Sequence, residues 1–112
     1  MEIYHNPRCR KSRETLQLLQ EKGLEPDIIL YLDKPPTKSR LKSILKMLDI
    51  KAIDLVRKTE QIYKDSYKGK TFSEKEWIDI LIENPKLIQR PIVINDGKAA
   101  LGRPPELVLD IL

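Results

Sequence analysis

The single cysteine of this 112-residue chain, Cys9, is the residue whose setting most clearly favours chemistry. Four cations lie close to it in the sequence: Arg8, Arg10, Lys11 and Arg13. A helix is predicted over Ser12 to Lys22, so Cys9 should lie near a helix N-terminus, where unpaired N–H groups favour an anion. Both features favour the thiolate, which is the reactive form of cysteine. Many free cysteines are buried small hydrophobes, but the flanking charges argue against burial here.

Ser12 stands where many redox proteins carry a second cysteine. The run Cys9-Arg10-Lys11-Ser12 has the spacing of a Cys-x-x-Cys redox motif, with serine in the last position. A thiol chemistry that ends in a disulfide therefore needs a second thiol from another molecule.

The composition describes an ordinary globular protein, with 40% hydrophobic and 34% charged residues. This length suits one domain, residues 1–112. One cysteine excludes an internal disulfide, and the N-terminus has no apolar run long enough for a signal peptide or a membrane span, so we expect a cytoplasmic protein. One cysteine and one histidine are also too few for a structural zinc site, which normally takes four such ligands, so we expect no metal.

The formal net charge of +4 raises nucleic acid as a partner. The 21 basic residues are interspersed with 17 acidic ones, and aromatic residues make up 5% of the chain. A nucleic-acid surface needs a stripe of cations, with aromatic platforms if it binds single strands. We therefore expect no nucleic acid, and the cluster around Cys9 is better sized for a small anion.

The N-terminal third predicts a β-α-β unit. Ile3 to His5 is typical of the end of a strand, and Gly23 is typical of a helix C-terminus. The apolar run from Ile28 to Leu32 predicts a buried strand, parallel to the first because a helix connects them.

The middle of the chain predicts helices. Thr37 is a helix cap, followed by an apolar face at helical spacing: Leu41, Ile44, Leu45 and Leu48. A short helix is predicted near Ala52 to Val56, and Ser73 with Glu76 forms a capping box before another helix, whose apolar face holds Trp77, Ile80 and Leu81. Residues 59–71 allow no clear prediction.

The C-terminal part predicts a β-β-α unit. The turn Asn95-Asp96-Gly97 predicts an antiparallel hairpin, and Pro104-Pro105-Glu106 predicts the start of a last helix. The whole order predicts an α/β protein with a thioredoxin-like core, a mixed four-stranded sheet and a helical insertion at about residues 37–89. In such a core the redox cysteine stands at the start of the first helix, where Cys9 lies.

Five segments, in the same order along the chain, resemble the glutaredoxin-coupled arsenate reductase (ArsC) family, and most of all its short arsenate-reductase-like members. These segments are His5 to Cys9 with Ser12-Arg13, Ile29 to Leu32, Leu55 to Lys58, Gln89 to Val93 and Gly102 to Glu106. The resemblance implies reduction of arsenate to arsenite, with glutathione as cosubstrate, glutaredoxin as protein partner and no tightly bound cofactor.

The resemblance also implies the site residues. The nucleophile of the family falls on Cys9, with His5 and Ser12 as supporting residues. Its three anion-binding arginines fall on Arg57, Arg90 and Arg103, and planar guanidinium groups suit a tetrahedral oxyanion. His5 would lower the Cys9 pKa through a hydrogen bond or as a cation, and Ser12 would donate to the thiolate.

Arg90 and Arg103 each precede a proline, which holds the backbone extended and directs the side chain. Arg90-Pro91 falls where thioredoxin-like folds place a cis-proline opposite the active cysteine, so we predict a cis bond at Pro91. The assignment of Arg57 as an anion-binding residue rests mainly on the resemblance, because Lys58 beside it is equally plausible by composition.

Two other functions fit the same sequence. One is a glutathione-dependent reductase of thiols or mixed disulfides, in which the arginines would hold the carboxylates of glutathione. The other is a regulator similar to Spx, which binds RNA polymerase, although Ser12 replaces the second cysteine of that redox switch. We expect a monomer.

Overall fold

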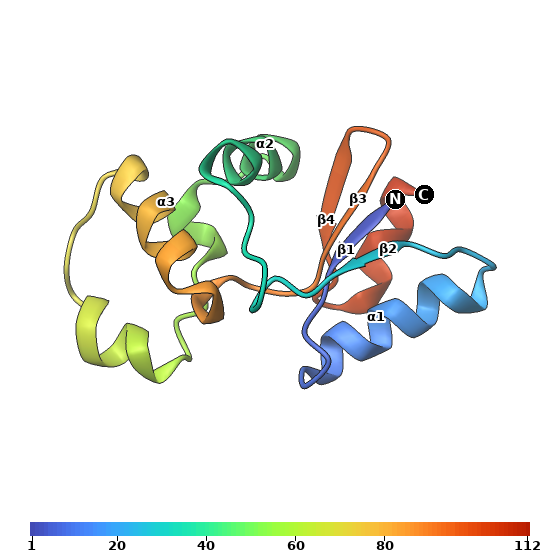
Figure 1. Cartoon of the computed structure of the whole chain (residues 1–112), viewed down its shortest axis with the longest axis horizontal. Coiled ribbons are helices and arrows are strands. Elements are labelled where there is room, and N and C mark those ends of the chain that lie inside the picture. Colours follow the sequence, from blue (N-terminus) through green and yellow to red (C-terminus); the bar gives the residue numbers. More distant parts are fainter. The chain divides into compact units, whose positions relative to one another are not determined.

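A computed structural model describes all residues from Met1 to Leu112. The chain divides into two compact units (Figure 1). The sheet unit comprises Met1–Lys34 and Arg90–Leu112, and the helical unit comprises Pro35–Gln89. The number of independent folding domains stays a prediction, and each unit is described here by itself.

The sheet unit contains the predicted mixed four-stranded sheet, in the order β2-β1-β3-β4. Its strands are β1 (Glu2–Tyr4), β2 (Asp27–Ile29), β3 (Ile92–Asn95) and β4 (Lys98–Leu101). β1 is parallel to β2 and antiparallel to β3, and β3 is antiparallel to β4. The helix α1 (Arg10–Glu21) connects the two parallel strands, and the short helix η4 (Pro105–Ile111) ends the chain. The α/β, thioredoxin-like arrangement predicted from the sequence is confirmed.

One apolar cluster holds both helices against the sheet. It joins Ile3 of β1 and Val93 of β3, which are paired neighbours, to Leu19 of α1 and Val108 of η4. All four side chains are fully buried. Because each comes from a different element, their burial orients α1, and with it Cys9, relative to β3.

The predicted hairpin is confirmed, and its local geometry explains it. Asp96 and Gly97 both have positive φ, 51° and 74°, as a two-residue turn between twisted antiparallel strands requires. Glycine takes this conformation without steric cost, and aspartate tolerates it better than most residues. The register that follows pairs Ile92 with Leu101 at the end of the hairpin nearest Arg90.

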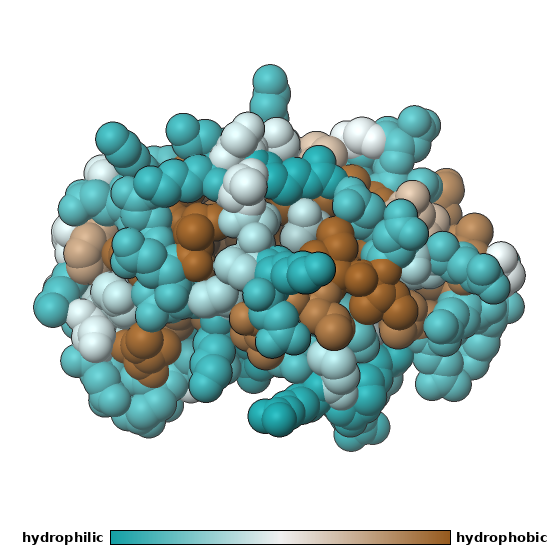
Figure 2. Space-filling model, viewed as in Figure 1, coloured by the Kyte–Doolittle hydropathy of each residue, from teal (hydrophilic) through white to brown (hydrophobic).

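The predicted buried strand at Ile28 to Leu32 was wrong in length and in burial. Strand β2 ends at Ile29, and Leu30 begins a turn. Ile28, Leu30 and Leu32 are 49%, 41% and 37% exposed, whereas Tyr31 is fully buried. Figure 2 shows apolar side chains gathered on the surface near β2. The physical reason is that the chain leaves the sheet after Ile29, so Leu30 and Leu32 lie in a turn beside the edge strand β2 and only Tyr31 of that turn points into the core.

The helical unit contains α2 (Lys38–Leu48), η1 (Ala52–Leu55), η2 (Tyr63–Tyr67), α3 (Glu74–Glu83) and η3 (Pro85–Leu87). Its helix starts follow from local capping. The Thr37 side chain accepts a hydrogen bond from the Arg40 N–H at 3.1 Å, and Ser73 and Glu76 form the predicted reciprocal capping box. The predicted apolar faces are buried, although Leu48 is only half-buried. In the stretch without a prediction, one turn of π-helix forms at η2.

None of the helices in the structure is both long enough and apolar enough to cross a membrane.

Candidate functional site

Cys9 occupies the N-cap of α1, as the sequence predicts. Its backbone is extended, with φ −93° and ψ 121°, and its side chain is partly exposed. The Cys9 N–H donates to the Asn6 carbonyl at 3.0 Å, and the Arg8 N–H donates to Asn6 Oδ1 at 3.0 Å. The Arg13 guanidinium donates to the Pro7 carbonyl at 2.9 Å. These bonds hold the loop that presents the thiol at the helix start.

The pKa of the Cys9 thiol is lowered by its surroundings. Partial burial acts in the opposite direction and raises the pKa, because it disfavours the thiolate. Hydrogen bonds from the Ser12 backbone N–H and the Arg90 side chain, the charge of Arg90 and the Lys11 backbone N–H outweigh burial. The helix terminus therefore acts through specific amide groups, and the main cation is Arg90, which is distant in sequence.

His5 and Ser12 are in direct contact, as two supporting residues of one site would be. His5 Nδ1 lies 2.6 Å from Ser12 Oγ, and that oxygen accepts the Asn6 N–H at 3.0 Å. Both side chains are buried. Burial, and then the positive charge of Arg13, lower the His5 pKa below its usual value of 6.5. A neutral imidazole is therefore favoured at neutral pH, and the role of His5 at the site stays a prediction.

Ser12 interacts with Cys9 through its backbone. The Ser12 N–H donates to the thiol, whereas the Ser12 hydroxyl oxygen contacts His5 and Asn6. The predicted donation from Ser12 thus comes from the amide. Its hydroxyl instead holds the end of β1 and the loop against α1.

Arg90 and Arg103 lie together in the sheet unit. Arg90 is 8% exposed, and its side chain donates a hydrogen bond to Cys9. Arg103 Nη1 donates to the Arg90 carbonyl at 3.2 Å, and Arg103 is exposed. The predicted cis bond at Pro91 is confirmed, and a second cis bond joins Arg103 to Pro104. Arg90 therefore contacts the thiol through its side chain, and Arg103 contacts the backbone of Arg90.

Arg57 lies in the helical unit, after η1. Its N–H donates to the Leu87 carbonyl at 2.6 Å, and its Nε contacts Thr59 Oγ1 at 3.2 Å and Glu60 Oε1 at 3.5 Å. Its Nη1 is buried and has no hydrogen-bond partner. The participation of Arg57 in the same site as Cys9 stays a prediction.

Three residues that hold the loop and the segments around the thiol were not predicted from the sequence: Asn6, Thr15 and Gly102. Asn6 is buried and makes the loop bonds described above. Its position before a proline is a turn signal that indicated a local role. Thr15 lies between Ser12 and Leu19 on the buried face of α1, and a polar residue on such a face indicates a specific contact. Nothing local marks Gly102, because its role depends on residues far away in the chain.

The arrangement has the parts that a nucleophilic thiol needs. Two backbone amides and one guanidinium stabilise the thiolate. No group of three or more histidine, cysteine, aspartate or glutamate side chains is placed to hold a metal ion.

Comparisons with known proteins agree with this geometry. The ArsC family model matches residues 4–111. The uncharacterized protein YfgD of Escherichia coli is 48% identical over 100% of this chain and 96% of its own length. An arsenate reductase of Haemophilus influenzae is 47% identical over 98% of this chain and 97% of its own. The solved structure of an arsenate reductase from Vibrio cholerae has a TM-score of 0.95 at 43% identity, over 99% of this chain and 96% of that one. On its sequence and its fold alike, the chain belongs to the ArsC family.

Proposed function

We propose that this protein is an arsenate reductase that converts arsenate to arsenite, with Cys9 as its nucleophile. The observation that carries the proposal is the Cys9 thiol at the N-cap of α1, which accepts hydrogen bonds from two backbone amides and from Arg90. The family membership and the names of the relatives support arsenate as the substrate.

The first step joins the substrate to the enzyme. Arsenate is mostly a dianion near neutral pH, so the guanidinium groups of Arg90 and Arg103, with that of Arg57, would hold its oxygens and offset its charge. The Cys9 thiolate attacks arsenic and one oxygen leaves as water, which forms a sulfur–arsenic bond without a change in oxidation state.

The reduction needs two electrons, which two external thiols supply because the chain has no second cysteine. Glutathione adds its sulfur to arsenic as a second oxygen leaves as water. The glutaredoxin thiolate then attacks the glutathione sulfur, which forms a glutathione–glutaredoxin disulfide and leaves the electron pair on arsenic, now As(III). Water hydrolyses the bond between Cys9 and arsenic and releases arsenite. In total, arsenate and two thiols give arsenite, one disulfide and water, and Cys9 returns to its thiol form. Glutathione and glutaredoxin act in reducing compartments, so we place this reaction in the cytoplasm.

The test is arsenate-dependent oxidation of NADPH in the presence of glutathione, glutaredoxin and glutathione reductase. We expect turnover by the native protein and none above the glutathione blank for Cys9→Ser. Arg90→Ala should lower kcat/KM for arsenate by about 100-fold or more, as loss of one donor to a developing anion does.

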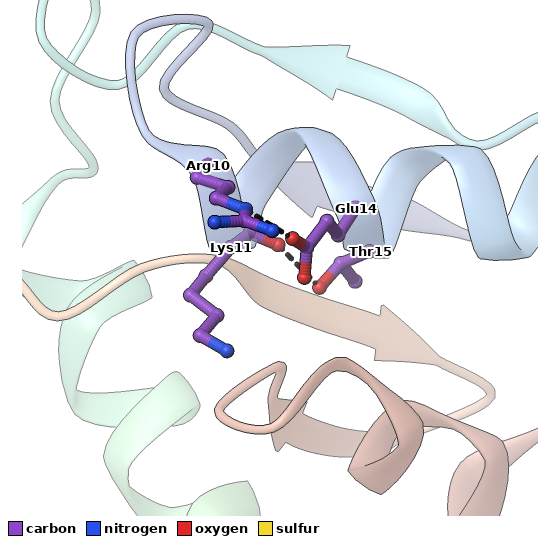
Figure 3. A network of polar contacts seen from close by, with 4 residues as sticks. All are labelled: Arg10, Lys11, Glu14 and Thr15. Atoms are coloured by element: carbon purple, nitrogen blue, oxygen red, sulfur yellow. Dashed lines mark hydrogen bonds and ion pairs between the residues drawn. The ribbon is translucent and has the colours of Figure 1, made fainter.

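Arg10→Ala is the matched control for Arg90→Ala. Arg10 is next to Cys9 in the sequence, but its side chain is 83% exposed and pairs with Glu14 at 2.8 Å (Figure 3). We expect kcat/KM to change by less than about twofold, because a solvated charge is screened. Equal losses in both variants would show that general positive charge, rather than Arg90, activates the site. Absence of arsenate turnover together with glutathionylation of Cys9 would overturn the proposal and favour a reductase of organic thiols.

A further inference from the structure

Three segments of the sheet unit meet at Gly102. Its N–H donates to the Pro91 carbonyl at 2.9 Å. A Cβ atom at this position would overlap Thr15 Oγ1, and would lie 2.8 Å from Pro91 Cγ and 3.0 Å from Thr15 Cγ2. Gly102 is not among the glycines with positive φ, so the backbone itself would accept other residues. Lack of space, rather than backbone conformation, excludes a side chain here.

The Thr15 side chain is fixed from the other direction. Thr15 is fully buried, and its hydroxyl donates to the Lys11 carbonyl one turn earlier at 2.8 Å (Figure 3). The same oxygen lies 3.5 Å from the Gly102 carbonyl. Thr15 therefore has little freedom to move away from an added methyl group, and Pro91, a buried ring, has little more.

Each of the three segments carries a part of the site. The helix α1, which holds Thr15, presents the Lys11 and Ser12 amides to the thiol. Pro91 follows Arg90, whose side chain donates to Cys9. Gly102 precedes Arg103, whose guanidinium donates to the Arg90 carbonyl at 3.2 Å. The contact at Gly102 is thus the place where the helix that carries the nucleophile touches both segments that carry the arginines.

We propose that Gly102 is a positioning residue. Because it has no side chain, the N-terminal part of α1 can lie close to the Arg90–Pro91 and Gly102–Arg103 segments, and this close approach lets the thiol and the arginines act together. The inference deepens the proposed function, because it concerns the same thiol and the same anion site. Displacements of about 1 Å in an active site can lower the rate about 100-fold, so the extra methyl group of alanine should lower the rate measurably.

Gly102→Ala tests this, with Thr15→Ala alone and in combination with it. We expect Gly102→Ala to raise the pKa of Cys9, because the helix moves away from Arg90, and to lower kcat/KM for arsenate by about 10- to 100-fold. Thr15→Ala removes both threonine atoms that the new methyl group would meet. The double variant should therefore have a Cys9 pKa and a kcat/KM closer to the native values than Gly102→Ala has. Recovery should be incomplete because Pro91 Cγ remains. Such coupling between two contacting residues is what a double-mutant cycle measures.

The first readout needs no arsenate. Cys9 is the only cysteine, so the pH dependence of its alkylation by iodoacetamide reports its pKa without interference. If the native protein does not turn over arsenate but Gly102→Ala still raises this pKa, the proposed function fails and the positioning role stands. If native turnover is normal and a folded Gly102→Ala keeps both the native pKa and the native kcat/KM, the positioning role fails alone.

Thr15→Ile approaches the same contact from the helix side and covers the case in which Gly102→Ala does not fold. It adds bulk facing Gly102 while the glycine is kept, and we expect the same direction of change in Cys9 pKa and kcat/KM. Thr15→Val keeps the size of threonine and removes the hydroxyl, so it shows how much of the Thr15 effect comes from the hydrogen bond to Lys11. A folded Thr15→Ile with the native pKa and native kinetics would also overturn the inference.

Discussion

The sheet unit and the helical unit differ in what they bury. All five buried polar or charged side chains lie in the sheet unit: His5, Asn6, Ser12, Thr15 and Arg90. The buried side chains of the helical unit are hydrophobic: Leu41, Ile44, Leu45, Ala52, Leu55, Val56, Trp77, Ile78, Ile80, Leu81, Leu87 and Ile88. Burying a polar group costs free energy unless it is hydrogen-bonded, so a cluster of such groups indicates a function other than packing.

The buried polar groups also lie in one place. His5, Asn6 and Ser12 bond to each other or to the loop that carries the thiol, and Arg90 bonds to the thiol itself. Thr15 bonds to the Lys11 carbonyl within the same helix, α1. The helical unit instead gains its stability from apolar burial and from capped helix starts. Substitutions in the helical unit should therefore change mainly the free energy of unfolding, whereas substitutions of the buried polar residues in the sheet unit should also change the reactivity of Cys9. Three predictions test this difference.

Leu81→Ala in α3 should give the largest change in stability. Leu81 is fully buried, so its truncation should lower the free energy of unfolding by about 2–5 kcal/mol, measured by urea denaturation. The matched control is Leu30→Ala in the sheet unit, where the leucine is 41% exposed and the loss should stay below about 0.5 kcal/mol. While Leu81→Ala is folded, the Cys9 alkylation rate should match that of the native protein. A changed rate would show that the helical unit also controls the thiol.

Ser12→Ala should have a smaller effect on stability, together with an effect on the site. The substitution leaves the Asn6 N–H and His5 Nδ1 without their partner in a buried place, at a cost of about 1–3 kcal/mol. The Ser12 amide remains, so the Cys9 pKa should rise less than in Arg90→Ala. Ser43→Ala on the exposed face of α2 is the control, because it makes the same change in a helix at a solvated position. A loss no larger than that of the control would mean that the hydroxyl does not hold the loop.

The smallest expected effect is the contribution of His5 to the pH dependence of stability. The His5 pKa is lowered in the folded protein, mainly by burial, so the unfolded chain takes up this proton first as the pH falls. His5 therefore contributes stability that is complete above its unfolded pKa of about 6.5 and is lost as the pH falls through the lower folded pKa.

The change to make is His5→Gln, followed by urea denaturation between pH 7.5 and 5. The variant should lose less stability than the native protein over this range, because it has no imidazole to protonate. His5 is the only histidine, so its NMR titration gives the folded pKa directly. A folded pKa at or above 6.5 would contradict the prediction and would make His5 a cation beside the thiol.

Much of the fold could be predicted from local sequence. The hairpin at Asn95-Asp96-Gly97 and the capping box at Ser73 and Glu76 depend on conformations and hydrogen bonds within four residues, so a short segment encodes them. Strand β2 could not be predicted in the same way. The apolar run Ile28 to Leu32 has the composition of a buried strand, but the edge strand β2 ends at Ile29, and Ile28 with Leu30 and Leu32 of the following turn is exposed.

The site also combines features that local sequence predicts with features that depend on contacts between distant segments. The position of one thiol at a helix start among cations follows from local sequence, because it requires only Cys9, its neighbours and the periodicity of α1. Which cation acts on the thiol depends on the tertiary structure: Arg10 beside Cys9 faces solvent, whereas the Arg90 side chain bonds to the thiol. The tertiary structure also decided that Gly102 must lack a side chain next to Thr15, 87 residues away in the chain. Local conformation depends on neighbours within a few residues, but a contact between distant segments exists only once the sheet and α1 have packed together.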